Sequence, residues 1–316
     1  GTSPPMRVIS AAEVEAALDY PSLVERLRQA FRRDIEVPLR HHHDVEVTGG
    51  DTATLLLMPA WQVDRHIGVK MVTVFPDNGE KSLPAIMGIY VLLDGKTGSP
   101  LALIDGPMLT VKRTAAASAL AAGYLARPDA ERLLMVGTGA LAPQLIMAHA
   151  AVRPICNVLI WGRNPQKAEK LAKRLNRRDF RVDWTDDLEE AARGAHVISC
   201  ATLSKEPLIR GAWLQPGTHV DLVGAFRPDM RESDDEAMRR ARVFVDTRAG
   251  ASKEGGDIVQ ALESGALATD DIAGDLFEMT RGDRSGRRFY DQITLFKSVG
   301  TAIEDLAAAQ LVNERA

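Results

Sequence analysis

The sequence contains little cysteine: Cys156 and Cys200 are the only two in 316 residues. Both lie in apolar, strand-like segments, so we expect buried, reduced thiols and a cytoplasmic location, not a disulfide framework. Neither sign of charge dominates, because 39 basic residues oppose 43 acidic ones and leave a net charge of −4. This balance gives no electrostatic reason to expect binding to nucleic acid or to an anionic membrane. We also expect neither a signal peptide nor a membrane-spanning segment, since no apolar run has the required length.

The apolar patterns that are present predict an α/β protein. Residues 11–33 have helical periodicity, whereas residues 45–105 contain short strands of an antiparallel sheet with a hairpin turn at 95–98. A helix of small residues follows at 110–126. Beyond it, short apolar strands alternate with helices, which is typical of a doubly wound parallel sheet.

We therefore expect two domains and a returning tail, a division that 316 residues can support. The first domain, of mixed α+β structure, is placed at 1–125, and the parallel-sheet domain at 126–290. Residues 291–316 are expected to form an amphipathic C-terminal helix that packs back on the first domain. The short stretch before Met6 is not expected to contribute to the fold.

A glycine-rich turn at the start of the second domain indicates a dinucleotide site. An apolar run ends at Val136, and Gly137-Thr-Gly139-Ala-Leu-Ala142 then precedes a helical pattern and a second apolar run. This is the strand–turn–helix–strand order of a Rossmann unit. Gly137 permits the tight turn, Gly139 lets the backbone approach a pyrophosphate at the positive end of the helix, and Ala142 allows close packing. The alternative is a glycine-rich connection that binds no nucleotide.

The end of the second strand favours NADP(H) over NAD(H). NAD-specific sites usually place a carboxylate there to bind the ribose 2′-hydroxyl, but this chain has Gly162, Arg163 and Asn164. A guanidinium attracts a 2′-phosphate and can bind it through paired hydrogen bonds. We therefore expect NADP(H) as the preferred cofactor with Arg163 on the phosphate, while NAD(H) stays possible. The alternative is a solvated surface arginine.

Two basic residues in apolar surroundings are candidates for the substrate site. Lys70 lies within IGVKMVTVF, where an interior-facing ammonium would be costly unless it is paired or its pKa is lowered. Periodicity alone leaves open whether Lys70 faces the interior or the solvent. Arg113 opens a helix of small residues and could bind a carboxylate through two hydrogen bonds. Its alternative is an ordinary surface arginine.

Several motifs together resemble one family. The chain carries GVKMVTVFPDN at 68–78, RTAAA at 113–117, EGGD at 254–257 and FKSVG at 296–300, in addition to the glycine turn. These segments, in this order, are similar to those of the ornithine cyclodeaminase/μ-crystallin family. The similarity extends over nearly the whole chain.

The resemblance implies a homodimer formed through the β-rich sheets of the first domains, NAD(P) bound in the second, and a small α-amino or α-imino acid substrate. It implies that Lys70 and Arg113 contact the substrate carboxylate and the reacting nitrogen, with Lys70 as the catalytic residue, and that Arg40 also binds the carboxylate. Clamping the carboxylate in this way would fix the α-carbon against the nicotinamide. The residues expected to bind the cofactor are Thr114, Gly137, Thr138, Gly139, Ala140, Leu141, Arg163, Asn164, Thr202 and Val223.

One departure from the family pattern bears on the reaction. Where cyclodeaminases carry a catalytic aspartate, this chain has Phe226, which cannot activate water or transfer a proton. The run RPDMRE at 227–232 instead resembles the ketimine-reductase branch, which includes μ-crystallin and the Δ1-pyrroline-2-carboxylate reductases. We therefore expect NADPH-dependent reduction of Δ1-pyrroline-2-carboxylate or its six-membered homologue to an L-amino acid such as proline. The alternatives are an NAD-dependent ornithine cyclodeaminase and a crystallin-like protein that binds NADPH and a small ligand.

Three adjacent histidines, His41, His42 and His43, raise the question of a metal site. In a strand their side chains alternate between faces, so they cannot all reach one ion. No cysteine or carboxylate accompanies them at ligand spacing. We therefore expect no metal.

Overall fold

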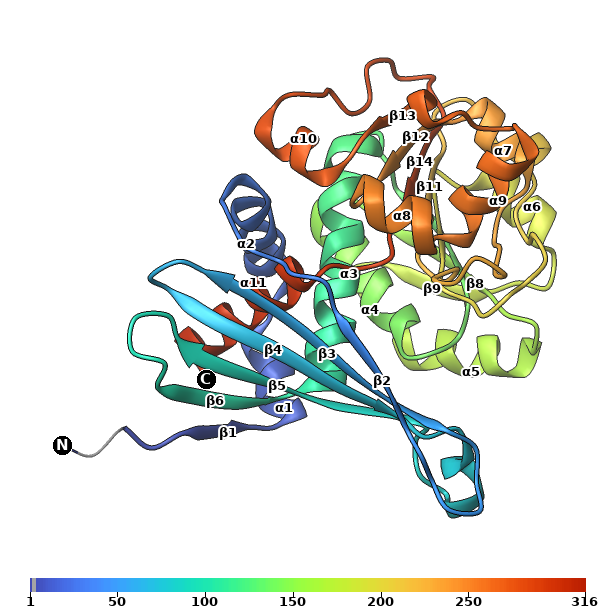
Figure 1. Cartoon of the computed structure of the whole chain (residues 1–316). Helices are drawn as coiled ribbons and strands as arrows, with labels where there is room; N and C mark the ends of the chain where they lie inside the picture. The colour runs from blue at the N-terminus through green and yellow to red at the C-terminus, as the bar shows by residue number, and fades with distance from the viewer. Residues whose placement is uncertain (2–3) are drawn as a thin grey trace. The chain divides into compact units, whose positions relative to one another are not determined.

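The structure is a computed structural model that describes residue 1 and residues 4–316. Thr2 and Ser3, in the stretch before Met6, lie outside the described residues. The chain divides into two compact units, which we call unit 1 (1–114 and 302–316) and unit 2 (115–301). Each unit has its own sheet (Figure 1).

Within the described residues, unit 1 contains a six-stranded mixed sheet. Its strands run in the order β1-β6-β5-β4-β3-β2, and all neighbours are antiparallel except the parallel pair β1 and β6. The expected hairpin joins β5 to β6, and the Asp94 carboxylate closes its turn by accepting hydrogen bonds from the Lys96 and Thr97 N–H groups. The strands are β1 (Arg7–Ile9), β2 (His41–Val45), β3 (Ala53–Gln62), β4 (His66–Val74), β5 (Ile86–Asp94) and β6 (Pro100–Asp105), with η1 (Pro76–Lys81) between β4 and β5.

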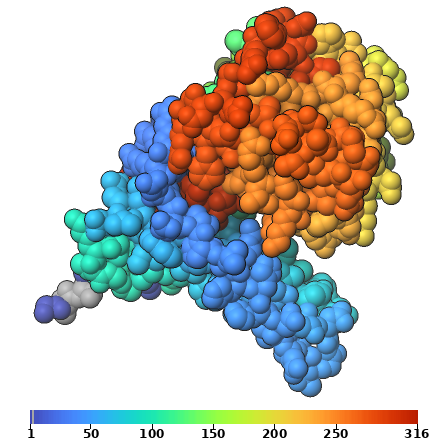
Figure 2. Space-filling view, turned by 45° about the horizontal axis from the view of Figure 1, so that its top comes forward, coloured from blue at the N-terminus to red at the C-terminus, as the bar shows by residue number. Residues whose placement is uncertain are grey.

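Helices cover one face of this sheet (Figure 1). α11 (Ala302–Arg315) packs on α2 (Tyr20–Arg32) and on β3 to β6, while α1 (Ala11–Ala17) contacts β6 and α11. The single helical segment expected at 11–33 is two helices, because the Asp19 side chain caps a new N-terminus at the Ser22 N–H. At the far end of the sheet, the segment between β2 and β3 contacts η1, where the Asp51 N–H donates a hydrogen bond to the Asp77 carboxylate. These two segments form the blue and cyan projection in Figure 2.

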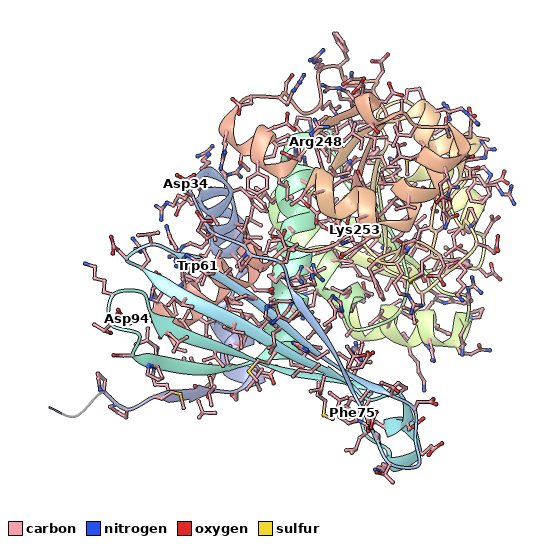
Figure 3. The ribbon with its side chains drawn as sticks, viewed as in Figure 1. Asp34, Trp61, Phe75, Asp94, Arg248 and Lys253 are labelled. Atoms are coloured by element: carbon pink, nitrogen blue, oxygen red, sulfur yellow. The ribbon has the colours of Figure 1, made fainter. Side chains whose placement is uncertain are left out.

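The other face of the sheet is apolar, although none of the described helices of unit 1 packs on it. Side chains alternate across a strand, so Lys70 and Tyr90 on the helix side are buried, whereas Met71 and Ile89 on the other side are 36% and 42% exposed. Trp61, labelled in Figure 3, is 37% exposed on the same face. We call this the open face; it is formed by Val8, Leu55, Leu57, Pro59, Trp61, Ile67, Val69, Met71, Met87, Ile89, Val91 and Leu103.

Unit 2 contains, in the part of the chain described, an eight-stranded sheet whose neighbours are all parallel. Its order is β13-β12-β14-β11-β10-β7-β8-β9, so the chain moves from β7 to β8 and β9 on one side and then returns to β10 on the other. The carboxyl ends of β7 and β10 therefore form a topological switch point, where open α/β sheets bind ligands. The strands are β7 (Arg132–Val136), β8 (Asn157–Trp161), β9 (Arg181–Trp184), β10 (Val197–Cys200), β11 (His219–Leu222), β12 (Arg242–Val245), β13 (Ile272–Gly274) and β14 (Thr294–Lys297).

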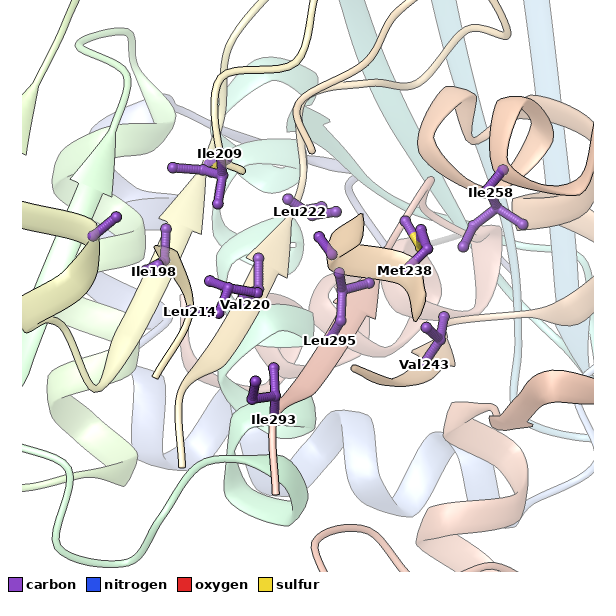
Figure 4. Packing of buried hydrophobic residues seen from close by; sticks show 14 of the residues in the cluster. Ile198, Ile209, Leu214, Val220, Leu222, Met238, Val243, Ile258, Ile293 and Leu295 are labelled. Carbon is purple, nitrogen blue, oxygen red and sulfur yellow. The ribbon is translucent and has the colours of Figure 1, made fainter. Parts of the chain in front are cut away.

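Helices and turns complete unit 2 around an apolar core. Leu222, Val220 and Leu295 are among the fully buried residues of this core (Figure 4). The elements are α4 (Leu141–Val152), α5 (Pro165–Leu175), α6 (Leu188–Gly194), η2 (Gly211–Trp213), α7 (Asp235–Arg240), α8 (Arg248–Glu254), α9 (Gly256–Ser264), η3 (Thr269–Asp271) and α10 (Leu276–Arg281), and α3 (Gly106–Leu125) extends from unit 1 into unit 2. The Rossmann-type α/β fold with a mixed α+β unit is thus the one expected from the sequence.

The C-terminal segment corrects one prediction. Thr294–Lys297, expected to belong to a helix, forms β14 between β11 and β12 in the interior of the sheet, and the helix α11 begins only at Ala302. A segment this short, in which only Leu295 and Phe296 are apolar, cannot be assigned to helix or strand from periodicity alone. The first boundary between the units lies at 114/115, within α3, whereas it was expected at 125/126, the end of that helix. The second lies at 301/302, after β14, whereas it was expected at 290/291, before that strand.

Candidate active site

A buried ion cluster in unit 1 forms around Lys70 on β4. Lys70 is paired in register with Met58 and Tyr90, which places its side chain on the helix-covered face, where it is 5% exposed. Its Nζ lies 3.2 Å from Asp305 Oδ1 and 3.0 Å from Asp305 Oδ2, on α11. Thr110 Oγ1 is 3.5 Å away. Of the two orientations that the sequence left open, Lys70 therefore has the interior one.

Arg113 on α3 joins the same cluster. Its Nε donates to Asp305 Oδ1 at 2.9 Å, and its Nη1 donates to Glu304 Oε1 at 3.0 Å. The side chain is buried, which excludes the alternative of an ordinary surface arginine. Two cations and two carboxylates thus share a site inside unit 1, and Asp305 bridges the two cations. We call these four residues the ion cluster.

The pKa values of Lys70 and Asp305 reflect two opposing effects, burial and the attraction between opposite charges. Burial lowers the pKa of the Lys70 ammonium, and the neighbouring Asp305 opposes that shift. Burial also opposes ionisation of Asp305, but Lys70 and Arg113 outweigh it and lower the pKa of this carboxyl. Both partners therefore stay charged, while Lys70 holds its proton less tightly than an exposed lysine does. A buried lysine with a lowered pKa is typical of a functional site.

The two carboxylates of the cluster were missed in the sequence. Glu304 and Asp305 lie in a C-terminal stretch predicted as an amphipathic helix, yet residues 303–312 are all buried. Adjacent acids in such an apolar helix give the same kind of signal as Lys70 in its strand. The sequence thus indicated the two cations as candidates but gave no indication of their counter-ions.

Arg40 lies outside the ion cluster. It is exposed and directly precedes β2, where His41 is paired with Leu57. If that register is continued, Arg40 lies opposite Met58, which is itself paired with Lys70. The backbones of Arg40 and Lys70 are then separated by twice the distance between neighbouring strands, or about 10 Å. The structure thus brings Lys70 and Arg113 together and leaves Arg40 at the edge of the same sheet.

In unit 2 the glycine turn has the geometry that a pyrophosphate requires. Gly137 has φ +128°, and a Cβ there would lie 2.5 Å from the Ala201 carbonyl oxygen. A Cβ at Gly139 would meet nothing within 4 Å, so the space beside this backbone is open. α4 begins directly afterwards, with Ala140 as its N-cap and no side-chain cap, so its positive end can bind an anion. This turn follows β7 at the switch point, and it fits a dinucleotide.

Of the other residues predicted to bind the cofactor, Val223 and Thr202 follow strands of unit 2, whereas Thr114 lies in unit 1. Val223 follows β11 and is buried, with its N–H donating to the Cys200 carbonyl. Thr202 follows β10 and donates both its N–H and its hydroxyl to Glu232. Thr114 belongs to unit 1, where its hydroxyl donates to the Thr110 carbonyl at 2.6 Å.

The end of β8 carries the residues expected near the adenosine ribose. Arg163 is exposed, and its Nη2 donates to Ser204 Oγ at 2.9 Å, in the loop after β10. Asn164 caps α5, its side-chain oxygen accepting from the Gln166 and Lys167 N–H groups. Asn164 thus has a local structural role, whereas Arg163 keeps its guanidinium at the surface.

The position of the missing family aspartate carries no replacement carboxylate. Phe226 follows β11, is 47% exposed, and has the Arg227 guanidinium 5.9 Å from its ring centre. Asp229 forms exposed ion pairs with Lys205 at 3.5 Å and with Arg227 at 3.7 Å. A carboxylate held in this way at the surface is not a substitute for a buried general base.

Other features of the described residues bear on the remaining expectations. His41, His42 and His43 form the exposed edge strand β2, and no group of three or more histidine, cysteine or acidic side chains there or elsewhere in the described chain is arranged to hold a metal ion. Cys156 and Cys200 are both free thiols; Cys200 is buried as expected, whereas Cys156, which directly precedes β8, is only half-buried. None of the described helices is long and apolar enough to cross a membrane.

Comparison with known proteins identifies the family. The model of the ornithine cyclodeaminase/mu-crystallin family matches residues 5–316. The chain belongs to this family. The Delta(1)-pyrroline-2-carboxylate reductase of Paracoccus denitrificans is 38% identical over 305 residues, covering 96% of this chain and 95% of the relative. The resemblance inferred from the motifs is thereby confirmed.

Solved structures of the family have the same fold. The Delta(1)-pyrroline-2-carboxylate reductase of Thermococcus litoralis, in complex with NADH and L-proline, matches with a TM-score of 0.90 and 34% identity, covering 98% of this chain and 97% of the other. An archaeal alanine dehydrogenase dimer with bound NAD matches with a TM-score of 0.89 and 30% identity, covering 98% and 96%. The predicted fold class is confirmed.

Proposed function

We propose that this protein reduces a small cyclic ketimine carboxylate, such as Δ1-pyrroline-2-carboxylate or Δ1-piperideine-2-carboxylate, to an L-amino acid. It is an NAD(P)-dependent oxidoreductase that acts on carbon–nitrogen double bonds and uses a nicotinamide cofactor, as its reductase relatives do. The observation that carries the proposal is the buried pair of Lys70 and Arg113 around Asp305. A lysine whose pKa is lowered can interact with a basic nitrogen, and an adjacent arginine can bind a carboxylate, so the pair suits a substrate that carries both groups.

The residues of the ion cluster have separate roles in this reaction. Arg113 Nη2, which has no hydrogen-bond partner among the described residues, binds the substrate carboxylate, and Arg40 is the second candidate for that role. Lys70 donates a hydrogen bond or a proton to the imine nitrogen, which receives the electron pair of the C=N bond as the carbon is reduced. When bound, the reduced nicotinamide supplies the hydride. Asp305 keeps Lys70 charged and in place.

We also propose NADPH as the preferred cofactor. The surface guanidinium of Arg163 follows β8, the position where a carboxylate would select NAD. Because Ser204 holds Arg163 at one nitrogen, the remaining donors can bind a 2′-phosphate.

The open face supports a homodimer. It is a continuous apolar surface, and antiparallel sheets normally cover such a face with other structure. We propose that a second copy of the chain packs on it, sheet against sheet; the archaeal alanine dehydrogenase of this family is a dimer. The two free thiols support a cytoplasmic location for the dimer.

One set of assays tests the proposed reaction. Purified protein is incubated with NADPH or NADH and either cyclic imine, and with ornithine and NAD as the cyclodeaminase alternative. We expect oxidation of NADPH with an imine and no ammonia from ornithine, because Phe226 supplies no general base. Lys70→Met should remove most turnover and leave NADPH binding intact, whereas Lys96→Met in the exposed hairpin turn should change neither. Ammonia release from ornithine, or full activity of Lys70→Met, would contradict the proposal.

A further inference from the structure

A single buried carboxylate in unit 2 joins two loops of the cofactor side. Glu232 is fully buried, and its Oε2 accepts hydrogen bonds from the N–H and the hydroxyl of Thr202, each at 2.8 Å. Its Oε1 accepts from the Gly224 N–H at 2.8 Å. Thr202 follows β10 and Gly224 follows β11, so Glu232 fixes the relative position of the two loops at the carboxyl edge of the sheet.

The backbone at Gly224 is packed too closely against Thr202 and Glu232 to accommodate a side chain. A Cβ on Gly224 would lie 2.2 Å from the Thr202 carbonyl oxygen and 2.5 Å from Glu232 Oε2. The loop after β11 can therefore approach Glu232 this closely only as glycine. A shift of the carboxylate would displace both loops together.

The carboxylate has other charged groups around it. Asp257 on α9 accepts a hydrogen bond from the Glu232 N–H at 3.2 Å and from Ser233 Oγ at 2.7 Å. Lys297 on β14 is also fully buried and donates to the Leu222 carbonyl at 3.1 Å. Cys200 on β10 is a further titratable neighbour, a buried thiol whose pKa is raised by burial and then by Glu232, so it stays neutral. One carboxylate, Asp257, and one cation, Lys297, thus act in opposite directions on the charge of Glu232.

A chain of hydrogen bonds connects Glu232 to the cofactor-selecting arginine. Thr202 Oγ1 accepts from the Ser204 N–H at 3.3 Å, and Ser204 Oγ accepts from Arg163 Nη2 at 2.9 Å. The buried carboxylate therefore supports the segment that holds Arg163 as well as the loop at the switch point. Removing this buried acceptor would leave the Thr202 and Gly224 donors without partners, and the two loops would become less well ordered.

We propose that ionised Glu232 is a positioning residue for the dinucleotide, holding Thr202 and Gly224 in the binding geometry, and that its protonation releases them and weakens cofactor binding. The proposal rests on the nicotinamide-cofactor part of the proposed function and not on the substrate. Burial, and then the charge of Asp257, raise the pKa of Glu232 to about 7, against the opposing effect of Lys297. A protonated oxygen becomes a donor and can no longer accept from an N–H group. Affinity should therefore fall as the pH falls through about 7.

The test is binding of NADH, measured by its fluorescence between pH 6 and pH 8.5 without substrate. NADH is used because the 2′-phosphate of NADPH itself titrates near pH 6. We expect the Kd of the wild type to rise severalfold from pH 8 to pH 6. Glu232→Gln should bind about tenfold more weakly at pH 8 and lose that pH dependence. Glu236→Gln, a matched change on the exposed face of α7, should retain the wild-type profile.

A second pair of variants covers the case in which Glu232→Gln does not fold. Thr202→Val removes one hydrogen bond to the ionised carboxylate, which should raise the pKa of Glu232 and move the midpoint of the affinity change to higher pH. Thr202→Ser keeps the hydroxyl and should keep the midpoint. An unchanged midpoint in Thr202→Val, or a wild-type profile in Glu232→Gln, would overturn the proposal. Absence of NADH binding at every pH would overturn it together with the cofactor assignment, whereas absence of imine turnover would affect only the proposed substrate.

Discussion

Replacing Asp305 by asparagine tests the ion cluster directly. Asp305 is the partner of both cations, with Lys70 Nζ at 3.0 Å and Arg113 Nε at 2.9 Å. In Asp305→Asn, Arg113 keeps its ion pair with Glu304 at 3.0 Å, whereas Lys70 keeps only neutral acceptors, the amide oxygen of the new side chain and the Thr110 hydroxyl at 3.5 Å. The substitution therefore leaves one buried ammonium without a counter-ion.

The magnitude follows from that unpaired charge. Removing one partner of a buried ion pair typically costs about 3–5 kcal/mol, most of it the penalty for the charge left behind. Lys70→Met should cost less, because Asp305 still has Arg113 and the methionine fills most of the volume. The double variant should accordingly be more stable than Asp305→Asn alone, by at least about 1 kcal/mol, since it removes the unpaired ammonium.

The sign of the pH dependence gives an independent check. Loss of Asp305 lowers the pKa of Lys70 further below its unfolded value, so the unfolded chain binds more protons than the folded one between these two values. Stability must then rise with pH in that interval. We expect the deficit of Asp305→Asn relative to wild type to shrink between pH 7 and pH 9.5, and the alkaline limb of kcat/KM to move to lower pH.

Urea unfolding followed by Trp61 fluorescence measures these effects in unit 1. The other tryptophans, Trp161, Trp184 and Trp213, belong to unit 2 and are replaced by phenylalanine in the background. Asp44→Asn on the exposed strand β2 is the matched control and should stay within about 0.5 kcal/mol of the background. A deficit for Asp305→Asn of similar size to this control, or one that grows with pH, would refute the reasoning about the cluster.

Three further variants test the cofactor and dimer assignments. Gly137→Ala should weaken NADH binding at least tenfold in a titration, because the residue has φ +128° and its Cβ would lie 2.5 Å from the Ala201 carbonyl oxygen; wild-type affinity would show that the turn is not where the dinucleotide binds. Arg163→Asp should reverse the NADPH/NADH ratio of kcat/KM by bringing a carboxylate towards the 2′-phosphate, and an unchanged ratio would remove Arg163 from that role. Ile89→Glu, in the centre of the open face, should convert the proposed dimer to monomer in sedimentation experiments, whereas a dimer of unchanged stability would place the interface elsewhere.

The sequence predicted those parts of the site that depend on local chemistry. The turn at Gly137 requires a glycine, and the Asp94 turn ends a hairpin, so both were identifiable from a few adjacent residues. The orientation of Lys70 was not, because its strand is apolar on both faces: Val69 and Met71 on the open face are as hydrophobic as Val72 and Val74 on the face of Lys70. Alternation distinguishes two faces only when one of them is polar.

The partners of these residues could not be predicted, since they depend on long-range packing. Asp305 meets Lys70 across 235 positions of the sequence, and it does so only because α11 packs on β4. Glu232 meets Thr202 because the chain beyond β11 folds back on the loop after β10, a return that no local pattern of residues indicates. The same reason explains β14, whose four residues have no pattern of their own and become a strand between two others.

The charge balance of the ion cluster bears on which substrate the protein can accept. Lys70 and Arg113 carry two positive charges, Glu304 and Asp305 two negative ones, so the cluster is neutral as a whole. A protonated cyclic imine with its carboxylate is also neutral, and it can bind there without adding a net charge to buried surroundings. Ornithine carries two ammonium groups and one carboxylate, so binding it would bury an excess positive charge, which costs several kcal/mol unless a further carboxylate compensates it. The neutral cluster therefore favours the imine over the diamine on electrostatic grounds.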